Sequence, residues 1–400
     1  MHPTSVLATI TGRDRPGVTA AFFAALAAHD VDVRDVEQVV IRERLILAVL
    51  LDLRGDPSSL RSSVTQTAQA LGMESEVVIA DDTHGPRGTD VARSHVIVIG
   101  HPLRPGALSH IAQRIADRGD NIESVAQLSG EPATSVELIV RTTDQSELRT
   151  VLVQAADETG VDIAVERAGL RRRAKRLVVL DVDSTLIRDE AINVLAARAG
   201  VSDRVAVITE RAMAGEVEFA ESLRSRVALL AGLPASTVEE VRDALELTPG
   251  ARTFVRTLHR LGFQVGVVSG GFTIFTDRFV AELELDFAAA NELEIVDGHV
   301  TGRVLGPVID RAGKAEALIR FALQFGVPMS QTVAVGDGAN DIDMLKAAGL
   351  GIAFNAKSAL RAAADTSLNV PYLDTVLFIL GIPQTEIDEA AADADDDDLR

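Results

Sequence analysis

The fold of this chain is decided by one stretch, LVVLDVDST at residues 177–185. Its first four residues are apolar and two of them are β-branched, which is typical of a short buried strand. The strand runs directly into Asp181 and Asp183. Because ligands bind just beyond the carboxyl ends of strands in a parallel α/β sheet, both carboxylates stand where chemistry is expected. Read alone, the stretch also fits a strand that ends in an ordinary turn rich in Asp, Ser and Thr.

Two later strands end in motifs that strengthen the chemical interpretation. The strand at residues 263–268 ends in Ser269-Gly270-Gly271, where a hydroxyl and backbone N–H groups can cradle a phosphate. The strand at 332–335 ends in GDGAND, residues 336–341. Between them Lys314 stands near the start of a predicted helix, where its charge can hold a phosphate. Each motif is weak alone, because Ser-Gly-Gly is also an ordinary loop and Lys314 also fits an ordinary surface lysine.

The order of these motifs resembles the haloacid dehalogenase superfamily of phosphohydrolases. The motifs span Asp181 to Asp341 and are specific in combination. The resemblance implies an α/β domain at 174–384 with a Rossmann-like parallel sheet. Residues 188–248 hold no convincing strand, so we expect a helical cap that excludes water from the site. Within the superfamily the chain is similar to the phosphoserine phosphatases. The cap positions that match this family's spacing are Glu190, Met213, Phe219 and Arg226.

This resemblance implies hydrolysis of O-phospho-L-serine to L-serine and phosphate, the last step of serine biosynthesis. Asp181 is the implied nucleophile, which forms an aspartyl-phosphate. A carboxylate and a phosphate repel each other, so a cation is required, and oxygen ligands suit Mg²⁺. The implied Mg²⁺ ligands are Asp181, Asp337 and the backbone carbonyl of Asp183. The side chain of Asp183 then stays free to serve as the acid and afterwards as the base.

The same resemblance assigns further residues to the substrate. Glu190 pairs with the ammonium group of phosphoserine and Arg226 with its carboxylate. Asp341 orients Lys314 or a metal-bound water. Without the family spacing, Glu190 and Arg226 would be interpreted as ordinary charges on helix surfaces. The residues expected to bind the substrate or its phosphate are Glu190, Met213, Phe219, Arg226, Ser269, Gly270, Gly271, Lys314 and Asn340.

An internal repeat precedes the catalytic part. The tripeptide Arg-Pro-Gly at 15–17 returns at 104–106, each time between an apolar strand and an apolar helix. Further matches are Asp32-Val33 with Asn121-Ile122 and Gln38 with Gln127. Each copy also offers two more strands with a helix between them. The pattern predicts ferredoxin-like βαββαβ units at 1–84 and 94–169.

Each copy resembles the ACT domain, a small regulatory module that commonly binds amino acids between paired copies. The Arg-Pro-Gly turn presents backbone N–H groups at a helix N-terminus, which suits a carboxylate. Two such copies before the catalytic domain resemble the mycobacterial type of phosphoserine phosphatase. The resemblance implies an amino-acid effector, with L-serine as the first candidate, and a homodimer. The alternative is that Pro-Gly only starts a helix. The implied effector positions are Asp14, Gly17, Val18, Gly106, Ala107, Asp120 and Asn121.

Composition narrows the class of protein. With 400 residues, 47% of them apolar, the chain can build several packed domains. It has no cysteine, which excludes disulfides and thiol chemistry, and its start lacks a secretory signal, so we expect a cytoplasmic protein. The net charge of −20 argues against a nucleic-acid partner. Because no apolar run reaches the ~18 residues of a membrane span, we expect no membrane association.

Polar segments complete the domain plan. Residues 81–93 form a linker between the repeats. The basic run at 171–176 resembles a nucleic-acid patch, but it lacks interleaved aromatic residues, and we expect a solvated hinge. Residues 385–400 are mostly acidic and cannot bury enough apolar surface, so we expect a disordered tail. A role of this tail in binding a partner is the alternative.

Two other functions stay open. The catalytic domain also fits a phosphatase for another phosphomonoester, or a phosphotransferase. A different class of function is an amino-acid sensor with a vestigial phosphatase domain. The presence of every residue assigned to catalysis argues against the sensor.

Overall fold

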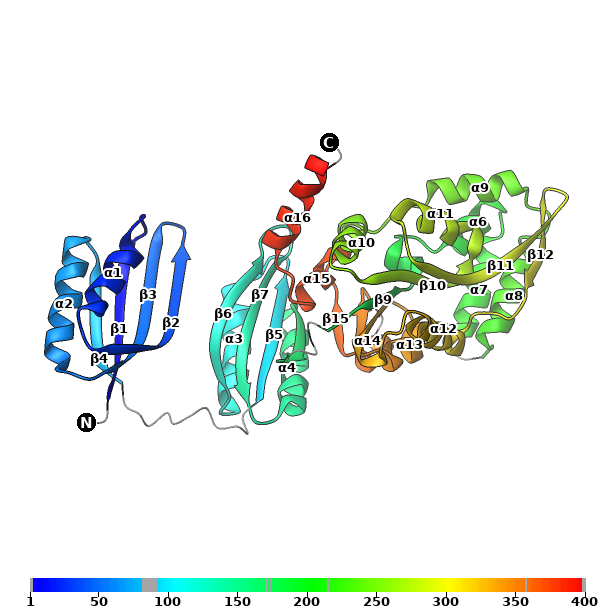
Figure 1. Cartoon of the computed structure of the whole chain (residues 1–400). Helices are drawn as coiled ribbons and strands as arrows, with labels where there is room; N and C mark the ends of the chain where they lie inside the picture. Colours follow the sequence, from blue (N-terminus) through cyan, green and yellow to red (C-terminus); the bar gives the residue numbers. More distant parts are fainter. Residues whose placement is uncertain are drawn as a thin grey trace. The chain divides into compact units, whose positions relative to one another are not determined.

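The computed structural model describes residues 3–80, 92–169, 172, 174–213, 216–356 and 358–397 (Figure 1). The chain divides into two compact units, residues 1–89 and 90–400. The first unit holds one copy of the repeat, and the second holds the other copy with the catalytic part. The expected linker at 81–93 lies outside the described residues except for its last two. Within the described ranges, no helix combines the length and the apolar character needed to span a membrane.

The first unit is a four-stranded antiparallel sheet with two helices (Figure 1). Its elements are β1 (Thr4–Arg13), α1 (Val18–Ala27), β2 (Val31–Ile41), β3 (Arg44–Leu53), α2 (Pro57–Ala70) and β4 (Glu74–Ile79). The strand order is β2-β3-β1-β4. Alternate residues of β3, such as Leu47, Val49 and Leu51, are fully buried in one core with residues of both helices. This alternation follows from the period of two along a strand.

The second copy repeats that plan. Its elements are β5 (Ala92–Gly100), α3 (Pro105–Asp117), β6 (Asn121–Ser129), β7 (Thr134–Thr142), α4 (Gln145–Thr159) and β8 (Asp162–Arg167). The strand order β6-β7-β5-β8 corresponds strand for strand to that of the first copy. Asp144 caps α4 by accepting a hydrogen bond from Glu147 N (3.0 Å), as Asp56 caps α2 through Ser58 N (3.0 Å). The ferredoxin-like fold predicted from the repeat is confirmed in both copies.

The catalytic part is built on a seven-stranded sheet in the order β12-β11-β10-β9-β13-β14-β15. Its strands are β9 (Leu177–Leu180), β10 (Gln264–Phe272), β11 (Phe287–Val296), β12 (His299–Leu305), β13 (Thr332–Gly336), β14 (Gly351–Phe354) and β15 (Thr366–Leu368). Neighbouring strands are parallel except for β12, which pairs antiparallel with β11 at one edge. The stretch that decides the fold thus lies at the centre of the sheet.

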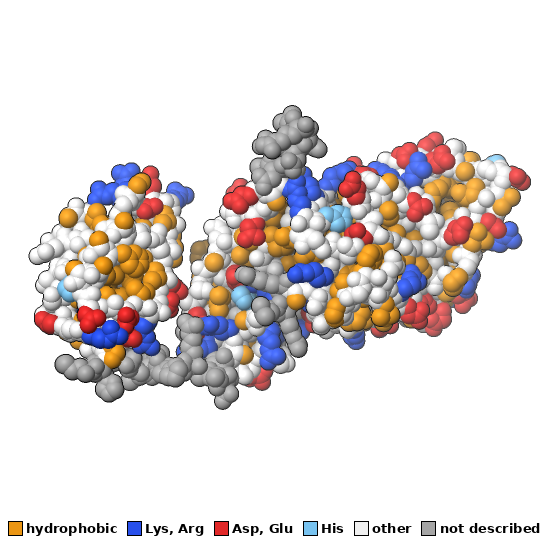
Figure 2. Space-filling model, viewed as in Figure 1, with side chains coloured by type: hydrophobic (Ala, Val, Ile, Leu, Met, Phe, Trp, Pro, Cys, Tyr) orange, Lys and Arg blue, Asp and Glu red, His pale blue; other side chains and the backbone are white. Residues whose placement is uncertain are grey.

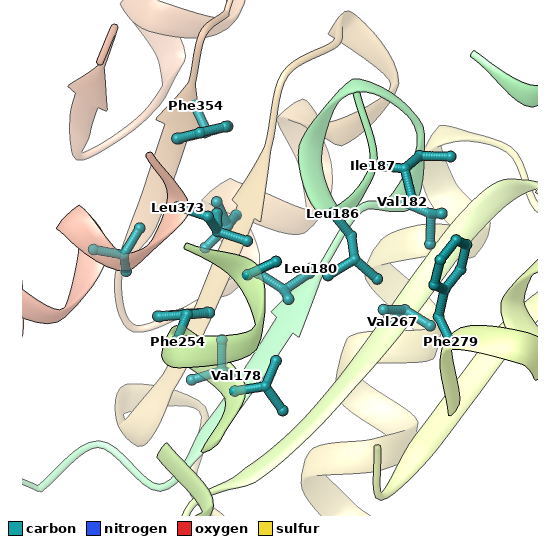
Figure 3. Packing of buried hydrophobic residues seen from close by; sticks show 14 of the residues in the cluster. Val178, Leu180, Val182, Leu186, Ile187, Phe254, Val267, Phe279, Phe354 and Leu373 are labelled. Carbon is teal, nitrogen blue, oxygen red and sulfur yellow. The ribbon is translucent and has the colours of Figure 1, made fainter. Parts of the chain in front are cut away.

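Both faces of β9 are covered, which explains its unbroken apolar run. Val178 and Leu180 belong to one core cluster, together with Phe254 from α10 (Figure 3). Leu177 and Val179 belong to a separate cluster. Because successive side chains point to opposite faces, a strand between two helical layers must be apolar at every position. The helices of the catalytic sheet are α10 (Ala251–Arg260), α11 (Thr273–Leu283), α12 (Arg311–Gln324), α13 (Ile342–Ala347), α14 (Ser358–Ala363) and α15 (Val376–Ile379).

The segment between β9 and α10 is helical, as expected for a cap. It contains α6 (Ala191–Arg198), α7 (Ser202–Met213), α8 (Phe219–Ala228) and α9 (Ala235–Ala244). Backbone hydrogen bonds from Gly232 N to Val300 O and from Ala235 N to Gly298 O, both 2.8 Å, tie this segment to the hairpin of β11 and β12. The cap is therefore fastened at the sheet edge that carries the antiparallel strand.

The prediction of a solvated hinge at 171–176 is wrong for Arg172 and Lys175. The Arg172 side chain is 9% exposed, and its guanidinium lies 2.6 Å from the Glu137 carboxylate of β7. Arg172 also donates to the carbonyl of Ile379 (3.3 Å). Lys175 is 5% exposed and donates to the carbonyl of Ser330 (3.0 Å). The prediction was wrong because these partners lie far away in sequence, and they satisfy the cations inside the joint between the second repeat and the catalytic part.

The prediction of a disordered tail from residue 385 is also wrong for the described residues. A helix, α16 (Gln384–Asp397), occupies this segment. Ile387 is 3% exposed and joins the large core cluster of the catalytic part. Gln384 donates to Asp388 one turn later (2.8 Å). The packing of Ile387 stabilises the helix. The prediction failed because it rested on the acidic average composition of the segment and gave no weight to this single apolar residue.

Candidate active site

The carboxyl ends of β9, β10 and β13 meet at one edge of the sheet and carry the predicted motifs. Asp181 follows β9 directly, is 3% exposed and accepts a hydrogen bond from Val182 N (2.7 Å). Ser184 adopts a left-handed φ of 59°, which turns the chain sharply. Within this turn the Asp183 carboxylate accepts a hydrogen bond from Ala191 N (2.8 Å) at the start of α6. The nucleophile motif is thus fixed by the strand behind it and the helix after it.

The Ser269-Gly270-Gly271 turn contacts the Asp183 side chain. Ser269 Oγ lies 3.4 Å from Asp183 Oδ2 and accepts a hydrogen bond from Gly271 N (2.8 Å). A Cβ at Gly271 would lie 2.9 Å from Asp183 Oδ2, so this close approach requires glycine. A Cβ at Gly270 would lie 2.9 Å from the ring of Phe219 on α8. The turn is therefore packed between the nucleophile motif and the cap.

Lys314 brings a buried positive charge to the same edge. It lies in the first turns of α12 and is fully buried. Its Nζ is 2.7 Å from Asp181 Oδ1 and 2.7 Å from Asp341 Oδ1. Burial alone would lower the pKa of Lys314, but the two carboxylates raise it above its ordinary value. Lys314 is therefore a cation at neutral pH. Asp310 caps α12 by accepting a hydrogen bond from Gly313 N (2.9 Å), which fixes the helix start that presents Lys314.

Asp181, Asp337 and Asp341 form an acidic cluster. One carboxylate oxygen from each lies within 4.8 Å of the other two. Burial and then the charge of Asp341 raise the pKa of Asp181 well above its ordinary value, and the same causes raise the pKa of Asp337 to about 7. Burial is the main cause of both shifts, and the neighbouring carboxylates add to it more than Lys314 opposes it. An oxygen-only donor set of this kind fits a hard divalent cation.

Asp183 differs electrostatically from this cluster. Burial, together with the negative charge of Glu190, raises the pKa of Asp183 to about 6, although the hydrogen bond from Ala191 N opposes the shift. A carboxyl group with a pKa near neutrality can give a proton and take one back at physiological pH. The surroundings therefore suit Asp183 for proton transfer, whereas the ionised form of Asp181 is favoured by Lys314, whose Nζ lies 2.7 Å away.

The cap places a cation and an anion near the cluster. Arg226, on α8, is 7% exposed, and its Nε has no hydrogen-bond partner among the described residues. Burial lowers the pKa of Arg226, and the charges that oppose this effect are those of Glu190 and Asp183. Glu190 precedes α6 and is exposed. An unpaired guanidinium and an exposed carboxylate together complement a substrate that carries both a carboxylate and an ammonium group.

The other predicted site residues fall as follows. Asn340 lies in the loop after β13, where a side chain at Gly338 would overlap its amide. Phe219 is the first residue of α8 and packs against the core. Met213 ends α7, but its side chain is not among those that the structure describes.

Asn291 belongs to the site although no motif in the sequence marks it. This residue on β11 is 2% exposed. Its Nδ2 donates to Gly270 O (2.8 Å), and its Oδ1 accepts a hydrogen bond from Ile309 N (2.7 Å). It therefore joins the Ser-Gly-Gly turn to the loop before α12. In the sequence, the only sign of this role is that the apolar run FAAA at 287–290 is followed by the polar Asn291. That sign can be interpreted only when the Ser-Gly-Gly segment and the loop before α12 are known to lie close together.

The predicted effector positions lie at the turns before α1 and α3 and at the start of β6. Gly17 precedes α1 with a φ of 93°, and Gly106 lies in the first turn of α3, where an added Cβ would meet nothing within 4 Å. Asp120 is already engaged, because it accepts hydrogen bonds from Arg118 Nε (2.9 Å) and Thr142 Oγ1 (3.0 Å). The turns themselves are therefore more open to a ligand than the Asp120 side chain.

Known proteins resemble the chain over nearly its whole length. Residues 175–349 match the family described as haloacid dehalogenase-like hydrolase, and residues 4–78 and 93–166 match ACT domain families. The chain is 55% identical to a phosphoserine phosphatase of Streptomyces coelicolor, over 98% of this chain and 96% of that protein. It is 54% identical to a phosphoserine phosphatase of Mycobacterium tuberculosis, over 99% of this chain and 97% of that protein.

Solved structures give a consistent result. A haloacid dehalogenase family hydrolase from Salmonella enterica serovar Typhi superposes with a TM-score of 0.64 at 26% identity, covering 72% of this chain and 98% of that one. A probable phosphoserine phosphatase from Vibrio cholerae, in its unliganded form, gives a TM-score of 0.57 at 37% identity, with 74% and 88% of the two chains covered.

Proposed function

The chain belongs to the phosphoserine phosphatases, with two ACT domains before a haloacid dehalogenase-like hydrolase domain, and we propose that it hydrolyses O-phospho-L-serine to L-serine and phosphate. One observation supports this function above the others. Asp181 lies 2.7 Å from the buried Lys314, within an acidic cluster that fits a divalent cation. The arrangement joins a nucleophile to the positive charge that phosphoryl transfer requires.

Asp181 is the proposed nucleophile. Its carboxylate attacks phosphorus, the bond from phosphorus to the serine oxygen breaks, and an aspartyl-phosphate forms. Lys314 reduces the repulsion between the two anions. We propose Mg²⁺ as the cofactor, held by Asp181, Asp337 and the backbone carbonyl of Asp183, where it would supply further positive charge to the phosphoryl oxygens. The residues proposed to hold the phosphoryl group are Ser269, Gly270, Gly271, Lys314 and Asn340.

Asp183 is the proposed acid and base. The serine alkoxide is a poor leaving group, so it takes a proton from Asp183 as it departs. Asp183 then accepts a proton from the water that hydrolyses the aspartyl-phosphate. Its pKa of about 6 suits both steps, and such proton transfer contributes roughly 10²–10⁴-fold to the rate.

The cap residues are proposed to select the amino-acid part of the substrate. Arg226 binds the carboxylate, for which its unpaired Nε is available, and Glu190 binds the ammonium group. Phe219 is the proposed apolar wall beside them, and Met213 stays a predicted substrate-binding residue. Phosphoserine thus satisfies a guanidinium that is otherwise buried without a full set of partners.

Phosphate release tests this proposal. L-phosphoserine and a panel of other phosphomonoesters, including p-nitrophenyl phosphate, are supplied with and without Mg²⁺, and Asp181→Asn serves as the inactive control. Turnover that needs Mg²⁺ and favours phosphoserine is expected. If other esters are hydrolysed but phosphoserine is not, the mechanism with Asp181 as nucleophile still holds, and the substrate-binding roles of Glu190 and Arg226 are rejected. Phosphoryl transfer to an added alcohol in place of water would indicate a phosphotransferase. An inactive wild-type chain would indicate a sensor with a vestigial catalytic domain.

We also propose that the Arg-Pro-Gly turns bind a regulatory amino acid, L-serine first. The open space at Gly106 supports a ligand there, since a carboxylate can reach the N-terminus of α3. Gly106→Val adds a side chain in that space, and its Cβ would meet no atom within 4 Å. Weaker inhibition by L-serine in this variant, with unchanged turnover in its absence, is expected. Equal inhibition of both proteins would place the effect at the active site.

A homodimer is the proposed assembly. β2 and β6 are edge strands of their sheets, and an edge strand offers unpaired backbone groups to another chain. Figure 2 shows hydrophobic side chains exposed on the first unit. The exposed apolar residues of β2 are Val33, Val36, Val39, Val40 and Ile41. Light scattering should give the mass of two chains for the wild type and one for Val39→Lys. A single-chain mass for the wild type would reject the dimer.

A further inference from the structure

A cavity of about 570 Å³ lies where the second ACT domain meets the catalytic domain. Its walls come from α4 and β8 on one side and from α14, β15 and the segment after β15 on the other. Among the described residues that line it, none belongs to the active site or to the proposed effector positions. Cavities of this size at domain interfaces are the usual places for small-molecule ligands.

Specific hydrogen bonds hold the two walls together. Thr366 Oγ1 donates to Ile163 O (3.0 Å). The backbone N of Asn369 donates to one carboxylate oxygen of Asp162 (2.7 Å), and its side-chain amide donates to the other (2.6 Å). Asp162 is 5% exposed, so these bonds satisfy a charge that would otherwise be buried alone. The two walls of the cavity are therefore held in place by specific hydrogen bonds between the two domains.

Arg149 of α4 reinforces the same joint. Its guanidinium donates to Ala364 O (2.7 Å) and lies 3.3 Å from the Asp365 carboxylate. Both partners belong to the catalytic domain. The charges of Arg149 and Asp365 are thus used in holding the walls and are not free for a ligand.

Two further charges face the cavity from opposite domains. Arg361 of α14 is exposed and forms no hydrogen bond or close ion pair with any residue that the structure describes, although its charge acts on the buried Asp162 carboxylate, where it opposes the burial that raises the pKa of that group. Asp157 of α4 is exposed and equally free among those residues. One wall therefore offers a guanidinium whose hydrogen-bond donors are open to a ligand, and the other offers a carboxylate without a hydrogen-bond partner among the described residues.

We propose that this cavity binds a small zwitterion, a free amino acid, with its carboxylate on Arg361 and its ammonium group on Asp157. A guanidinium is well shaped for a carboxylate, and a carboxylate accepts the hydrogen bonds of an ammonium group. A simple anion would meet Arg361 but would be repelled by Asp157. A neutral solute would leave both charges unpaired. This site lies away from the Arg-Pro-Gly turns.

A ligand that bridges both domains favours their joined arrangement, because it binds fully only when both walls are present. The joint is also in contact with the catalytic loop. The rings of His101 and Tyr372 meet edge to face at 6.0 Å between centroids. Next to Tyr372, Leu373 N donates to the carbonyl of Pro249 (2.8 Å), and Thr248 Oγ1 donates to the carbonyl of Thr185 in the Asp181 loop (2.7 Å). Occupancy of the cavity can therefore influence that loop.

Calorimetric titration of the full chain tests the site without any need for turnover, so the test stands apart from the proposed reaction. The probes are L-serine, a panel of other free amino acids and inorganic phosphate. At least one amino acid should bind. Arg361→Ala and Asp157→Asn should each weaken that binding by about tenfold or more, the loss expected for one charge-assisted contact. Arg361→Lys, which keeps the charge, should retain part of it.

Matched controls change the same kinds of side chain elsewhere. Arg256→Ala and Asp277→Asn replace exposed residues of α10 and α11 that do not line the cavity, and they should bind as the wild type does. The proposal is overturned if no amino acid binds, or if the cavity variants bind like these controls. Binding that Gly106→Val removes and Arg361→Ala leaves intact would place the ligand at the turn. Phosphate binding that Arg361→Ala removes and Asp157→Asn leaves intact, without amino-acid binding, would reduce the site to an anion site.

Discussion

Asp181 and Asp183 stand two residues apart, yet their side chains meet different surroundings. Asp181 lies 2.7 Å from Lys314 and within the acidic cluster. Asp183 turns toward the N-terminus of α6 and the hydroxyl of Ser269. The left-handed conformation of Ser184 comes directly after Asp183 and turns the chain toward α6. A single local turn thus gives two identical side chains two chemical tasks.

Replacing Asp183 tests its task. Asp183→Asn keeps the size of the side chain but removes the proton that it exchanges, so we expect kcat to fall by roughly 10²–10⁴-fold. Steady-state phosphate release from L-phosphoserine measures the effect. Asp189→Asn changes an exposed residue of the same loop and should leave kcat within about twofold. A wild-type kcat in Asp183→Asn would remove the acid–base role.

Arg226 should determine which phosphate ester the enzyme accepts. Arg226→Ala removes the proposed partner of the substrate carboxylate, so KM for phosphoserine should rise by about tenfold or more. KM for p-nitrophenyl phosphate, which has no carboxylate, should change far less. Arg224→Ala provides the control, because Arg224 is exposed on the same helix. Equal changes for both esters would show that Arg226 supports the fold of the cap and does not select the substrate.

The sequence predicts the site well where the chemistry is local. Asp181, Ser269 and Asp337 each follow an apolar strand, and parallel strands bring their carboxyl ends to one edge. Asn291 escapes prediction because its two partners lie in loops that only the folded sheet brings together. The burial of Arg226 could not be predicted for the same reason. Helix periodicity alone does not tell which face of a cap helix lies toward the site.

At the scale of elements, the close packing of β10 on β11 depends on one glycine. Gly266 pairs with Phe287 across these strands, and a Cβ at Gly266 would overlap the Phe287 ring and its carbonyl oxygen. The ring has little room to move, because it stacks on Phe321 with 4.2 Å between centroids. The contact between β10 and β11 therefore tolerates no added atom at this position.

Gly266→Ala should lower the free energy of unfolding by about 1–3 kcal/mol, the usual cost of overpacking a core. Urea unfolding followed by circular dichroism measures it. Gly130→Ala adds the same methyl group where the nearest atom beyond the neighbouring residues, Gln127 Nε2, is 4.0 Å away, and it should leave the midpoint almost unchanged. Similar midpoints for Gly266→Ala and the wild type would mean that the ring of Phe287 can shift after all.

A helix or strand can be predicted from the sequence when the pattern of its own residues explains why it forms. β9 is apolar throughout because helices cover both of its faces, and the repeat predicts its sheets because each copy has its own core. The pattern fails for α16, which depends on the burial of Ile387 in a core built by distant segments. It fails again for Arg172, whose charge is balanced by Glu137 of another domain.

At the scale of the whole molecule, Glu137 connects the second ACT domain to the catalytic domain. Its carboxylate lies 2.9 Å from His95 Nδ1 and 2.6 Å from an Arg172 nitrogen. Arg172 in turn donates to the carbonyl of Ile379 at the end of α15. Burial raises the pKa of Glu137, but His95 and Arg172 outweigh burial and lower it from 4.5 to about 2. The joint thus depends on a carboxylate that stays ionised.

This lowered pKa predicts a pH-dependent joint. Between about pH 2 and pH 4.5, Glu137 binds more protons in the unfolded chain than in the folded chain. The stability that Glu137 contributes is therefore complete above pH 4.5, and it is lost as the pH falls toward 2. Glu137→Gln should therefore lower the free energy of unfolding at pH 7 by about 1–2 kcal/mol, and the difference from the wild type should shrink at pH 3. Urea midpoints at the two pH values measure this, with Glu316→Gln, an exposed residue of α12, as the control. If the variant and the wild type differ in stability by the same amount at both pH values, the joint needs the shape of Glu137 and not its charge. The proposal of an ionised link between the two domains would then be wrong.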